Sequence, residues 1–464
     1  MDPISLFARN FASITYDDLP SKVVAATKNE ILDLLAVAVG GSSRAGVEEL
    51  RQLVTDWGGK QEATVFGWGH RLPAFHAAQL NATMAHALDF DDTHDTAVMH
   101  PGVVIIPVCL VLAERQGGVS GQEFITAVAL GVDMMCRLGL ATVPHSGNRI
   151  DTGWHLTVLY GFLAAAGVAG RLLGLDEDGI VDALGIAYHQ ASGNGQCVLD
   201  GALTKRMGPG FAARGGIVAA LMAEKGITGA RNCLEGKYGL FNQYHQGGYD
   251  PEALTAGLGK DYEGVNVSIK PYPCCRGTHT AIDAALSLVS THTIKAGDVK
   301  EISVYTGQGS YSVLSTPLEI KSRPRNAVDS QFSIPWSVAV AVARGRVTMA
   351  DFIEEAIESR EILDVSEKIR VELDSGLSRR SGVEPARVTI TTMRGGQYTE
   401  EVEHPLGSPE RPMTWNDLEK KLSGCSSYGA RRLAERNVKK LAELLGHLEE
   451  LGDVGEVIEL TTWH

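Results

Sequence analysis

The sequence predicts a mainly α-helical fold with an α+β part: a large all-helical domain joined to a smaller α+β domain. The chain has 464 residues, more than one hydrophobic core usually serves, so two domains are expected. The apolar pattern is helical from about residue 19 to 229, and it changes near residue 262 to short alternating segments separated by helical ones. We therefore expect a discontinuous helical domain over residues 1–261 and 401–464, and an α+β domain over residues 262–400.

The first domain should consist of helices packed against helices. One early helical face carries only apolar side chains and ends at two glycines, Gly40 and Gly41; its members are Ile31, Leu32, Leu35 and Val39. Ser120 and Glu123 have the spacing of a capping box, and Asp176 can cap a further helix. These helices are apolar around much of their circumference, so we expect other helices to surround them.

The second domain should combine strands and helices. Three segments alternate with the period of a strand, namely Val299–Tyr305, Lys368–Leu373 and Ala386–Met393. Helical patterns lie between them, at residues 278–289, 333–343 and 349–357. Residues 415–451 are helical again, with an apolar stripe of Leu441, Leu444, Leu445 and Leu448. We expect this tail to pack back on the first domain.

The overall charge argues against two classes of partner. The net charge is −14 and no Lys/Arg-rich run occurs, so neither nucleic acid nor an anionic membrane is an expected partner. An acidic protein that binds a small anion must gather its few cations locally. Isolated Lys and Arg residues beside glycine-rich segments are therefore the first places to search.

Cysteine usage and the chain start indicate a reducing cytoplasm. The seven cysteines are odd in number and form no CxxC pair, so neither a disulfide framework nor a zinc site is indicated. The start, Met1 to Ala12, lacks a cationic lead and a long apolar run. The most apolar stretch, Val103–Leu112, is about half a membrane span and contains Pro107, so we expect a buried segment.

A cluster of histidines and aspartates is the first candidate site. It runs His86-Ala-Leu-Asp89-Phe-Asp91-Asp92-Thr93-His94, and His100 follows it. If its start is helical, His86, Asp89 and Thr93 share a face. The cluster could orient a histidine acid or base through Asp89, or it could be an acidic loop with solvated side chains. It could also hold a divalent metal, as in a metal-dependent hydrolase, through His86, Asp89, Asp91, Asp92, His94 and His100.

A second candidate is His155, in the segment Gly153-Trp154-His155-Leu156-Thr157. It stands in a glycine-led turn before a helix of small residues. A lone histidine is usually a hydrogen-bonded structural residue, and an acid–base role is the alternative.

A third candidate is Lys205, in the segment Thr204-Lys205-Arg206-Met-Gly208-Pro209-Gly210. The two cations precede what we expect to be a Gly-Pro-Gly turn into a helix over Phe211–Lys225. A helix start offers free N–H groups and positive dipole character, so this combination suits an anion. The alternative is a surface lysine beside a helix cap.

The fourth candidate is the segment Lys270-Pro-Tyr-Pro-Cys274-Cys275-Arg276-Gly-Thr-His279. Two prolines fix the chain locally, and Lys270, Arg276 and His279 add positive or titratable groups. Adjacent cysteines are more often buried structural residues than catalytic thiols. Further along, Lys321–Asn326 supplies more cations ahead of Trp336.

Taken in order, these motifs resemble the MmgE/PrpD family. The resemblance rests on ALDFDDTH with a later HPG, on GWH, on the TK before GPGFAA, and on KPYPCCRGTH. It extends from about residue 5 to 460. Members include 2-methylcitrate dehydratase, cis-aconitate decarboxylase and iminodisuccinate epimerase. The resemblance implies a homodimer that uses no cofactor, with a large all-helical domain and a smaller α+β domain.

The resemblance also implies roles for particular residues. It marks as lining the site Asp89, Thr93, His100, His155, Lys205 and Lys270. Of these we expect Thr93 to bind substrate and the other five to be catalytic, and we add as substrate-binding Cys275, Arg276, His279 and Trp336. No metal is implied. The sequence departs from some members that carry histidine near Gly208 and Cys275 or tyrosine near Trp336. We therefore expect the family's chemistry and not an identical substrate.

The implied reaction is a lyase acting on a small polycarboxylate through a carbanion beside a carboxylate. Lys205 and Lys270 would hold that carboxylate, and His100 or His155 would transfer a proton. Dehydration and decarboxylation are both open. Epimerisation of an iminodisuccinate-like diacid is an alternative, and metal-dependent hydrolysis by the cluster at residues 86–100 is a second.

Overall fold

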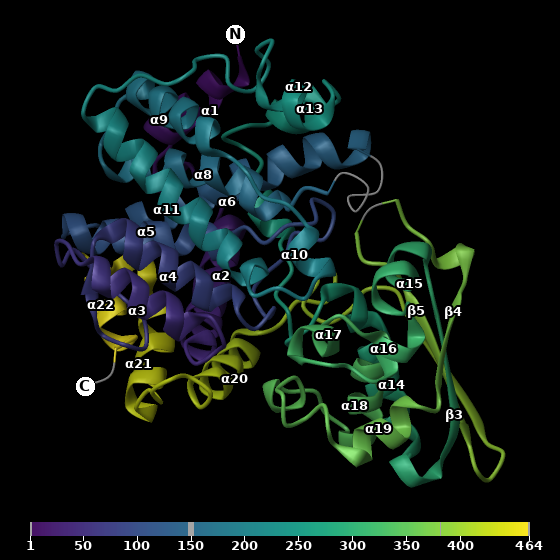
Figure 1. Cartoon of the computed structure of the whole chain (residues 1–464). Helices are drawn as coiled ribbons and strands as arrows, with labels where there is room; N and C mark the ends of the chain where they lie inside the picture. The colour runs from purple at the N-terminus through teal and green to yellow at the C-terminus, as the bar shows by residue number, and fades with distance from the viewer. Residues whose placement is uncertain (1, 147–152, 381, 463–464) are drawn as a thin grey trace. The chain divides into compact units, whose positions relative to one another are not determined.

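A computed structural model describes residues 2–146, 153–380 and 382–462 of the chain (Figure 1). It divides into two compact units, which are described separately. Unit 1 comprises Met1–Ile269 and Thr414–His464, and unit 2 comprises Lys270–Met413. The predicted fold class, mainly helical with an α+β part, is confirmed.

Unit 1 is a bundle of helices built around α8 and α11. Helix α8 (Leu156–Leu172) is buried along almost its whole length and packs against α11 (Thr204–Glu224), α6 (Gly121–Ser146) and α9 (Glu177–Gln190). The other helices of eight or more residues surround this centre: α1 (Pro3–Ser13), α2 (Ser21–Gly41), α3 (Val47–Trp57), α4 (Ala74–His86), α5 (Gly102–Gln116), α20 (Trp415–Ser426) and α21 (Glu435–Gly446). Short helices complete the unit: α10 (Gln196–Leu199), α12 (Leu240–His245), α13 (Pro251–Thr255) and α22 (Gly455–Leu460).

The predicted tail packs within unit 1. Helix α20 lies against α2, and α21 contacts α2 and α20. The predicted leucine stripe faces inward, since Leu441, Leu445 and Leu448 are buried and Leu444 is half-buried. The apolar face of α2 is buried as expected, including Ile31.

Of the two predicted helix caps, the one at Asp176 is confirmed and the capping box at Ser120 and Glu123 is confirmed in part. The Asp176 carboxylate accepts the N–H of Gly179 at the start of α9, at 2.9 Å. Ser120 Oγ accepts the N–H of Glu123 at 3.2 Å, but the Glu123 carboxylate binds Arg171 instead of closing a capping box. An arginine fork is the stronger partner for a carboxylate, so the reciprocal bond is not made.

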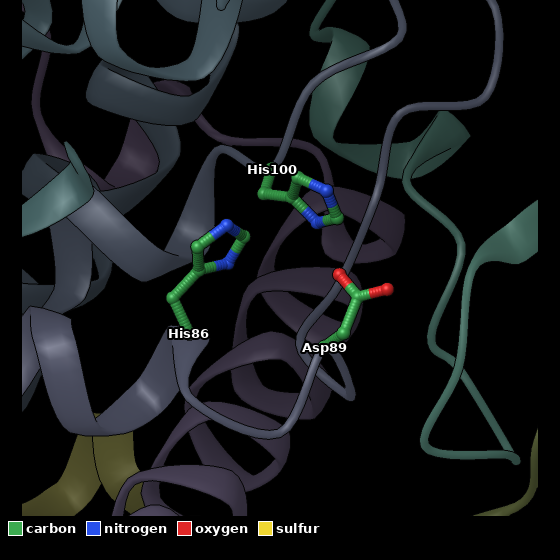
Figure 2. A group of neighbouring side chains, drawn as sticks. All are labelled: His86, Asp89 and His100. Atoms are coloured by element: carbon green, nitrogen blue, oxygen red, sulfur yellow. The ribbon is translucent and has the colours of Figure 1, made fainter. Parts of the chain in front are cut away.

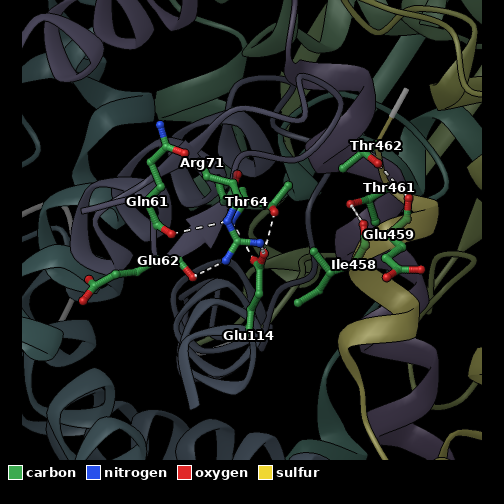
Figure 3. A network of polar contacts seen from close by, with 10 residues as sticks. Gln61, Glu62, Thr64, Arg71, Glu114, Ile458, Glu459, Thr461 and Thr462 are labelled. Atoms are coloured by element: carbon green, nitrogen blue, oxygen red, sulfur yellow. Dashed lines mark hydrogen bonds and ion pairs between the residues drawn. The ribbon is translucent and has the colours of Figure 1, made fainter. Parts of the chain in front are cut away.

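A small hairpin interrupts the helices of unit 1 and was not predicted. Strands β1 (Ala63–Thr64) and β2 (Arg71–Leu72) pair antiparallel. Figure 3 shows how Glu114 of α5 holds both strands, accepting from Thr64 N and from Arg71 Nη1, each at 2.6 Å. Two-residue strands are too short to leave a periodic signal.

Within the described residues, α6 contains one stretch, Gly121–Thr142, that is long and apolar enough to cross a membrane. Of its most apolar window, 94% is buried inside the structure, which is typical of a core helix. The predicted buried segment Val103–Leu112 lies in α5, which is buried along this stretch and keeps Pro107 inside the helix.

Unit 2 is a four-stranded mixed sheet covered by helices. The strand order is β4 (Ile369–Leu373), β3 (Val299–Thr306), β5 (Ala386–Thr392) and β6 (Gln397–Val402); β3 is parallel to β4 and antiparallel to β5. Helices α14 (His279–His292) and α18 (Ile334–Arg344) contact the sheet, and α19 (Arg360–Ser366) packs on α18. Three short helices lie between β3 and α18 in the chain: α15 (Gln308–Leu314), α16 (Leu318–Ser322) and α17 (Ala327–Gln331).

Three of the four strands of this sheet were predicted, and one helix was predicted wrongly. Strand β6 was missed because its less exposed positions are Tyr398, Glu400 and Val402, and Glu400 interrupts the alternation of apolar and polar residues. Residues 349–357 were expected to be helical but form a 3₁₀ turn at Met349–Asp351 followed by turns. The Asp351 carboxylate accepts the N–H of Thr348 at 2.8 Å, and this local cap closes the first turn.

Candidate active site

The predicted His/Asp cluster forms the loop between α4 and α5, residues 87–101, which we call the α4–α5 loop. Helix α4 ends at His86, so the expected helical face through His86, Asp89 and Thr93 does not exist. Asp89 has a φ of +51°, in the left-handed region that a non-glycine residue enters at a cost. This turn directs the chain away from the helix axis, and the loop's aspartates diverge to different partners.

Asp91 holds two histidines. Its carboxylate Oδ2 lies 2.7 Å from Nδ1 of His86 and 3.3 Å from Nδ1 of His100. The side chains of Asp91 and His86 are fully buried, and that of His100 is 17% exposed. The two imidazole rings lie edge to face, with centroids 4.9 Å apart. The histidine-orienting carboxylate is thus Asp91, whereas Asp89 was expected in that place.

These contacts fix which ring nitrogens carry protons. Nδ1 of His100 also lies 2.6 Å from the carbonyl oxygen of Asp92. Both neighbours of this nitrogen accept hydrogen bonds, so Nδ1 must be the protonated one, and the neutral ring keeps its lone pair on Nε2. The same argument applies to His86 through Asp91. Burial lowers the pKa of His86, and the Asp91 carboxylate opposes that shift.

Helix α8 supports His100 from the other side. The backbone N–H of His100 donates to Thr157 Oγ1 at 3.0 Å. His155 is the N-cap residue of the same helix and is 9% exposed. Its ring centroid lies 6.0 Å from that of His86. Three imidazoles, those of His86, His100 and His155, are therefore neighbours.

Lys205 and Asp89 form an ion pair within this group. Nζ of Lys205 lies 2.7 Å from Oδ1 of Asp89, and the two side chains are 13% and 5% exposed. A pair so shielded from water interacts more strongly than a surface pair. The structure thus brings together four of the five residues predicted to be catalytic: Asp89, His100, His155 and Lys205.

The expected Gly-Pro-Gly turn is wrong, because Gly208, Pro209 and Gly210 lie inside α11. The glycines allow close helix contacts instead. A Cβ on Gly210 would lie 2.4 Å from the backbone oxygen of Gln79, and one on Gly208 would lie 2.6 Å from Val158 and 3.5 Å from Nδ1 of His155. Lys205 consequently lies in the first turn of α11, one residue after its start.

The other polar residues of the loop have structural partners. Asp92 accepts the N–H of Gly102 at the start of α5, at 2.9 Å. Thr93 pairs with Ser268 through two backbone hydrogen bonds. His94 accepts the N–H of Ala97 on Nδ1 at 3.0 Å and lies 3.4 Å from Glu263. Thr93, predicted to bind substrate, thus shapes the loop through its backbone.

Part of the cluster has the spacing of a metal site. His86, Asp89 and His100 each offer one ligand atom, and these atoms lie within 4.8 Å of one another (Figure 2). Nε2 of His86 has no hydrogen-bond partner among the described residues. Asp89 already binds the Lys205 ammonium, so a metal would compete with that cation. Of the six ligands considered from the sequence, Asp91, Asp92 and His94 lie outside this group.

The remaining predicted site residues belong to unit 2. The side chains of Lys270, Arg276 and His279 are buried, and Arg276 Nη1 binds Nδ1 of His279 at 3.2 Å and the carbonyl of Leu406 at 2.9 Å. Cys275 is half-buried. Trp336 lies in the core, with its indole N–H donated to the carbonyl of Asp351 at 3.0 Å. Contact between Trp336 and a substrate would require that core to open.

Comparison with known proteins identifies the family. Residues 5–252 match the MmgE/PrpD N-terminal domain, and residues 272–446 match the MmgE/PrpD C-terminal domain. The chain belongs to the MmgE/PrpD family. Similar proteins in this family include cis-aconitate decarboxylases. One from Aspergillus terreus is 29% identical, covering 97% of this chain and 94% of the relative. A human one is 25% identical, covering 96% and 92%.

A second kind of relative matches less of the chain. The 2-methylcitrate dehydratase of Salmonella typhimurium is 25% identical, covering 59% of this MmgE/PrpD chain and 57% of the relative. The resemblance predicted from the ordered motifs is therefore confirmed. Two residues of the site, Asp91 and His86, had no catalytic or substrate-binding role in that prediction and were named only as possible metal ligands. Asp91 lies in the ALDFDDTH motif, and His86 directly precedes it.

Proposed function

We propose that this protein is a cofactor-independent lyase that acts on a small polycarboxylate, by decarboxylation or dehydration, through a carbanion beside a carboxylate. The observation that carries the proposal is the proximity of a shielded lysine, Lys205, to imidazoles whose tautomers are fixed. The names of the relatives, cis-aconitate decarboxylase and 2-methylcitrate dehydratase, supply the substrate class. The greater coverage of the decarboxylases favours an acid resembling cis-aconitate.

Each group has a chemical task in this proposal. The Lys205 ammonium binds a substrate carboxylate on which negative charge grows, a contribution of about 10²–10³ in rate for a preorganised donor. His100, protonated on both nitrogens, donates from Nε2, while Asp91 stabilises the imidazolium. In a decarboxylation the bond to the departing carboxylate breaks, its electron pair enters the conjugated acid, and this proton completes the product. Proton transfer of this kind contributes about 10²–10⁴.

The test is proton NMR of the purified, EDTA-treated protein in D₂O. The panel comprises cis-aconitate, 2-methylcitrate, citrate, iminodisuccinate and related diacids. A decarboxylase or dehydratase consumes its substrate, and the product spectrum tells the two apart. Deuterium entering beside a carboxylate without net loss of substrate would identify the epimerase alternative, for which His100 and His155 offer two proton-transfer groups.

Metal-dependent hydrolysis is the second candidate, favoured by the spacing of His86, Asp89 and His100. These donors suit zinc or another transition metal. Activity that EDTA abolishes and one divalent metal restores would support this candidate. Turnover of a polycarboxylate after EDTA treatment would reject it in favour of the lyase.

We also propose a cytoplasmic homodimer. All seven cysteines lie in the described part of the chain and none of them is in a disulfide, in keeping with a reducing compartment. One face of α11 carries exposed or half-buried apolar residues along its length, among them Phe211, which is 44% exposed, and the N-cap residue Leu203 beside it is 42% exposed. The adjoining Trp57 of α3 is 53% exposed, and Arg214 of α11 lies over its ring. Light scattering should give twice the chain mass, and Phe211→Asp should shift it toward the monomer.

A further inference from the structure

A buried lysine from the C-terminal tail donates a hydrogen bond to the backbone of the α4–α5 loop. Lys421 of α20 pairs with Asp33 of α2, with Nζ and Oδ1 2.5 Å apart, and donates to the backbone carbonyl of Phe90 at 2.8 Å. Its ammonium also lies 3.8 Å from the centre of the Phe90 ring. The side chains of Lys421 and Asp33 are 3% and 1% exposed. Water therefore does not compete for this ammonium.

The carbonyl of Phe90 lies between Asp89 and Asp91, the two aspartates that pair with the lysine and the histidines of the site. It belongs to the peptide that joins Phe90 to Asp91, whose carboxylate holds His86 and His100. On the other side of Phe90 stands Asp89, in its left-handed conformation and paired with Lys205. Rotation of this one peptide would move both carboxylates relative to their partners.

We propose that Lys421 is a positioning residue for the reaction: it fixes the Phe90–Asp91 peptide and, through it, the His100 imidazole and the Lys205 ammonium. The inference rests on the function proposed above. A buried ion pair often stabilises the folded state no more than apolar residues of similar volume would, so stability alone does not explain this pair. The ammonium supplies a directed hydrogen bond at one backbone oxygen, which apolar packing does not.

A second lysine offers a matched control. Lys28 of α2 also joins α2 to the tail, pairing with Glu449 at 2.8 Å and donating to the carbonyl of Gly446. It has the same combination of one carboxylate and one backbone carbonyl, but its partners lie outside the α4–α5 loop. Any general effect of loosening the tail should appear in Lys28 variants as well.

The experiment compares the double variant Lys421→Met/Asp33→Asn with the double variant Lys28→Met/Glu449→Gln. Removing both partners leaves no unpaired buried charge, so the site variant should melt near wild type. Its kcat should fall by about 10–100-fold, as when supporting residues of a site are lost, and its KM should change little. Asp33→Asn alone keeps the ammonium on Phe90 and should retain most activity in the folded protein, but it leaves that ammonium buried without its carboxylate and should melt below wild type. If the double variant does not fold, Lys421→Gln/Asp33→Asn, which also removes both charges, takes its place with the same expected loss of kcat.

A readout without turnover separates this inference from the proposed function. The ¹⁵N shifts of His86 and His100 report the protonation of each ring nitrogen, and they should change in the Lys421 variant but not in the Lys28 variant. Wild-type kcat and unchanged imidazole shifts in the Lys421 double variant would overturn the inference. If wild type turns over none of the acids, the proposed function fails, and the imidazole shifts still decide whether Lys421 positions the loop.

Discussion

The buried carboxylate of Asp91 lies 2.7 Å from Nδ1 of His86 and shares its Oδ2 atom with Nδ1 of His100. A single anion thus orients two neighbouring imidazoles, whose ring centroids lie 4.9 Å apart. Each ring is held with its Nδ1 protonated, so the neutral form of each ring carries its lone pair on Nε2.

Replacing Asp91 by asparagine should impair catalysis more than folding. The amide keeps the shape of the carboxylate but loses the charge that stabilises a His100 imidazolium, so kcat should fall by about 10²-fold or more. Because His100 must be protonated to donate, the alkaline limb of the kcat–pH profile should also move to lower pH. Asp95→Asn in the same loop, where the carboxylate accepts from Ser268 Oγ, is the control. Equal kinetics in the two variants would contradict the role of Asp91.

Lys205→Ala should abolish turnover while the protein remains folded. The ammonium is the shielded cation of the site, and its loss removes the partner of the developing carboxylate charge, at a cost of about 10²–10³ in kcat/KM or more. Lys225→Ala, at the exposed end of the same helix, should leave kinetics unchanged. A Lys205→Ala protein that melts like wild type and works normally would refute the assignment.

Gly208→Ala should show that α11 must approach α8 closely. The added Cβ would lie 2.6 Å from Val158, in the first turn of α8, and relieving that overlap should cost about 1–3 kcal/mol of stability. Because Thr157 of this turn holds the His100 backbone, kcat should fall too. Gly424→Ala in α20 meets nothing within 4 Å and should be neutral or stabilising by up to about 1 kcal/mol. Thermal melts and steady-state kinetics of the pair give the comparison.

Glu30→Gln should stabilise the protein increasingly as pH rises. Burial, followed by the charges of Asp92 and Asp33, raises the pKa of Glu30 well above its ordinary value. In the window between the unfolded and folded pKa values the folded state holds one more proton, so stability falls with rising pH, by about 1.4 kcal/mol per unit. Glutamine removes this loss. The melting-temperature gap between variant and wild type should therefore widen from about pH 5 to pH 8.

The matched control for that prediction is Glu443→Gln, which removes a carboxyl from an exposed position of α21. It should track wild type across the same pH range. A gap for Glu30→Gln that stays constant with pH would mean that Glu30 ionises in the folded protein much as it does in the unfolded chain.

Periodicity predicted the helical core and three of the strands because each signal lies within a few neighbouring residues. The inward face of α2, the cap at Asp176 and strand β3 are all local features of this kind. The course of α11 was not predictable in this way. Gly208, Pro209 and Gly210 usually signal a turn, but tight packing against α4 and α8 keeps the segment helical.

The candidate site was predictable in its membership and not in its pairing. The motifs indicated Asp89, His100, His155 and Lys205, and these lie together. Which aspartate serves which cation depends on the positive φ of Asp89, a backbone choice that composition does not encode. Lys421 gave no signal either, since it stands beside Lys420 in an amphipathic helix and meets the loop only through the fold.

The return of the tail to unit 1 has a consequence for biosynthesis. Helix α2 leaves the ribosome early, yet its partner α20 begins at Trp415, 374 residues after Gly41 (415 − 41). At roughly 5–20 residues per second, the surface of α2 that α20 covers stays open for about 20–75 seconds. The nascent chain must keep this surface from aggregating through that interval, and the Asp33 carboxylate remains solvated there until its lysine arrives. A ribosome stalled before residue 415 would hold a chain in which Lys421 does not yet contact the α4–α5 loop.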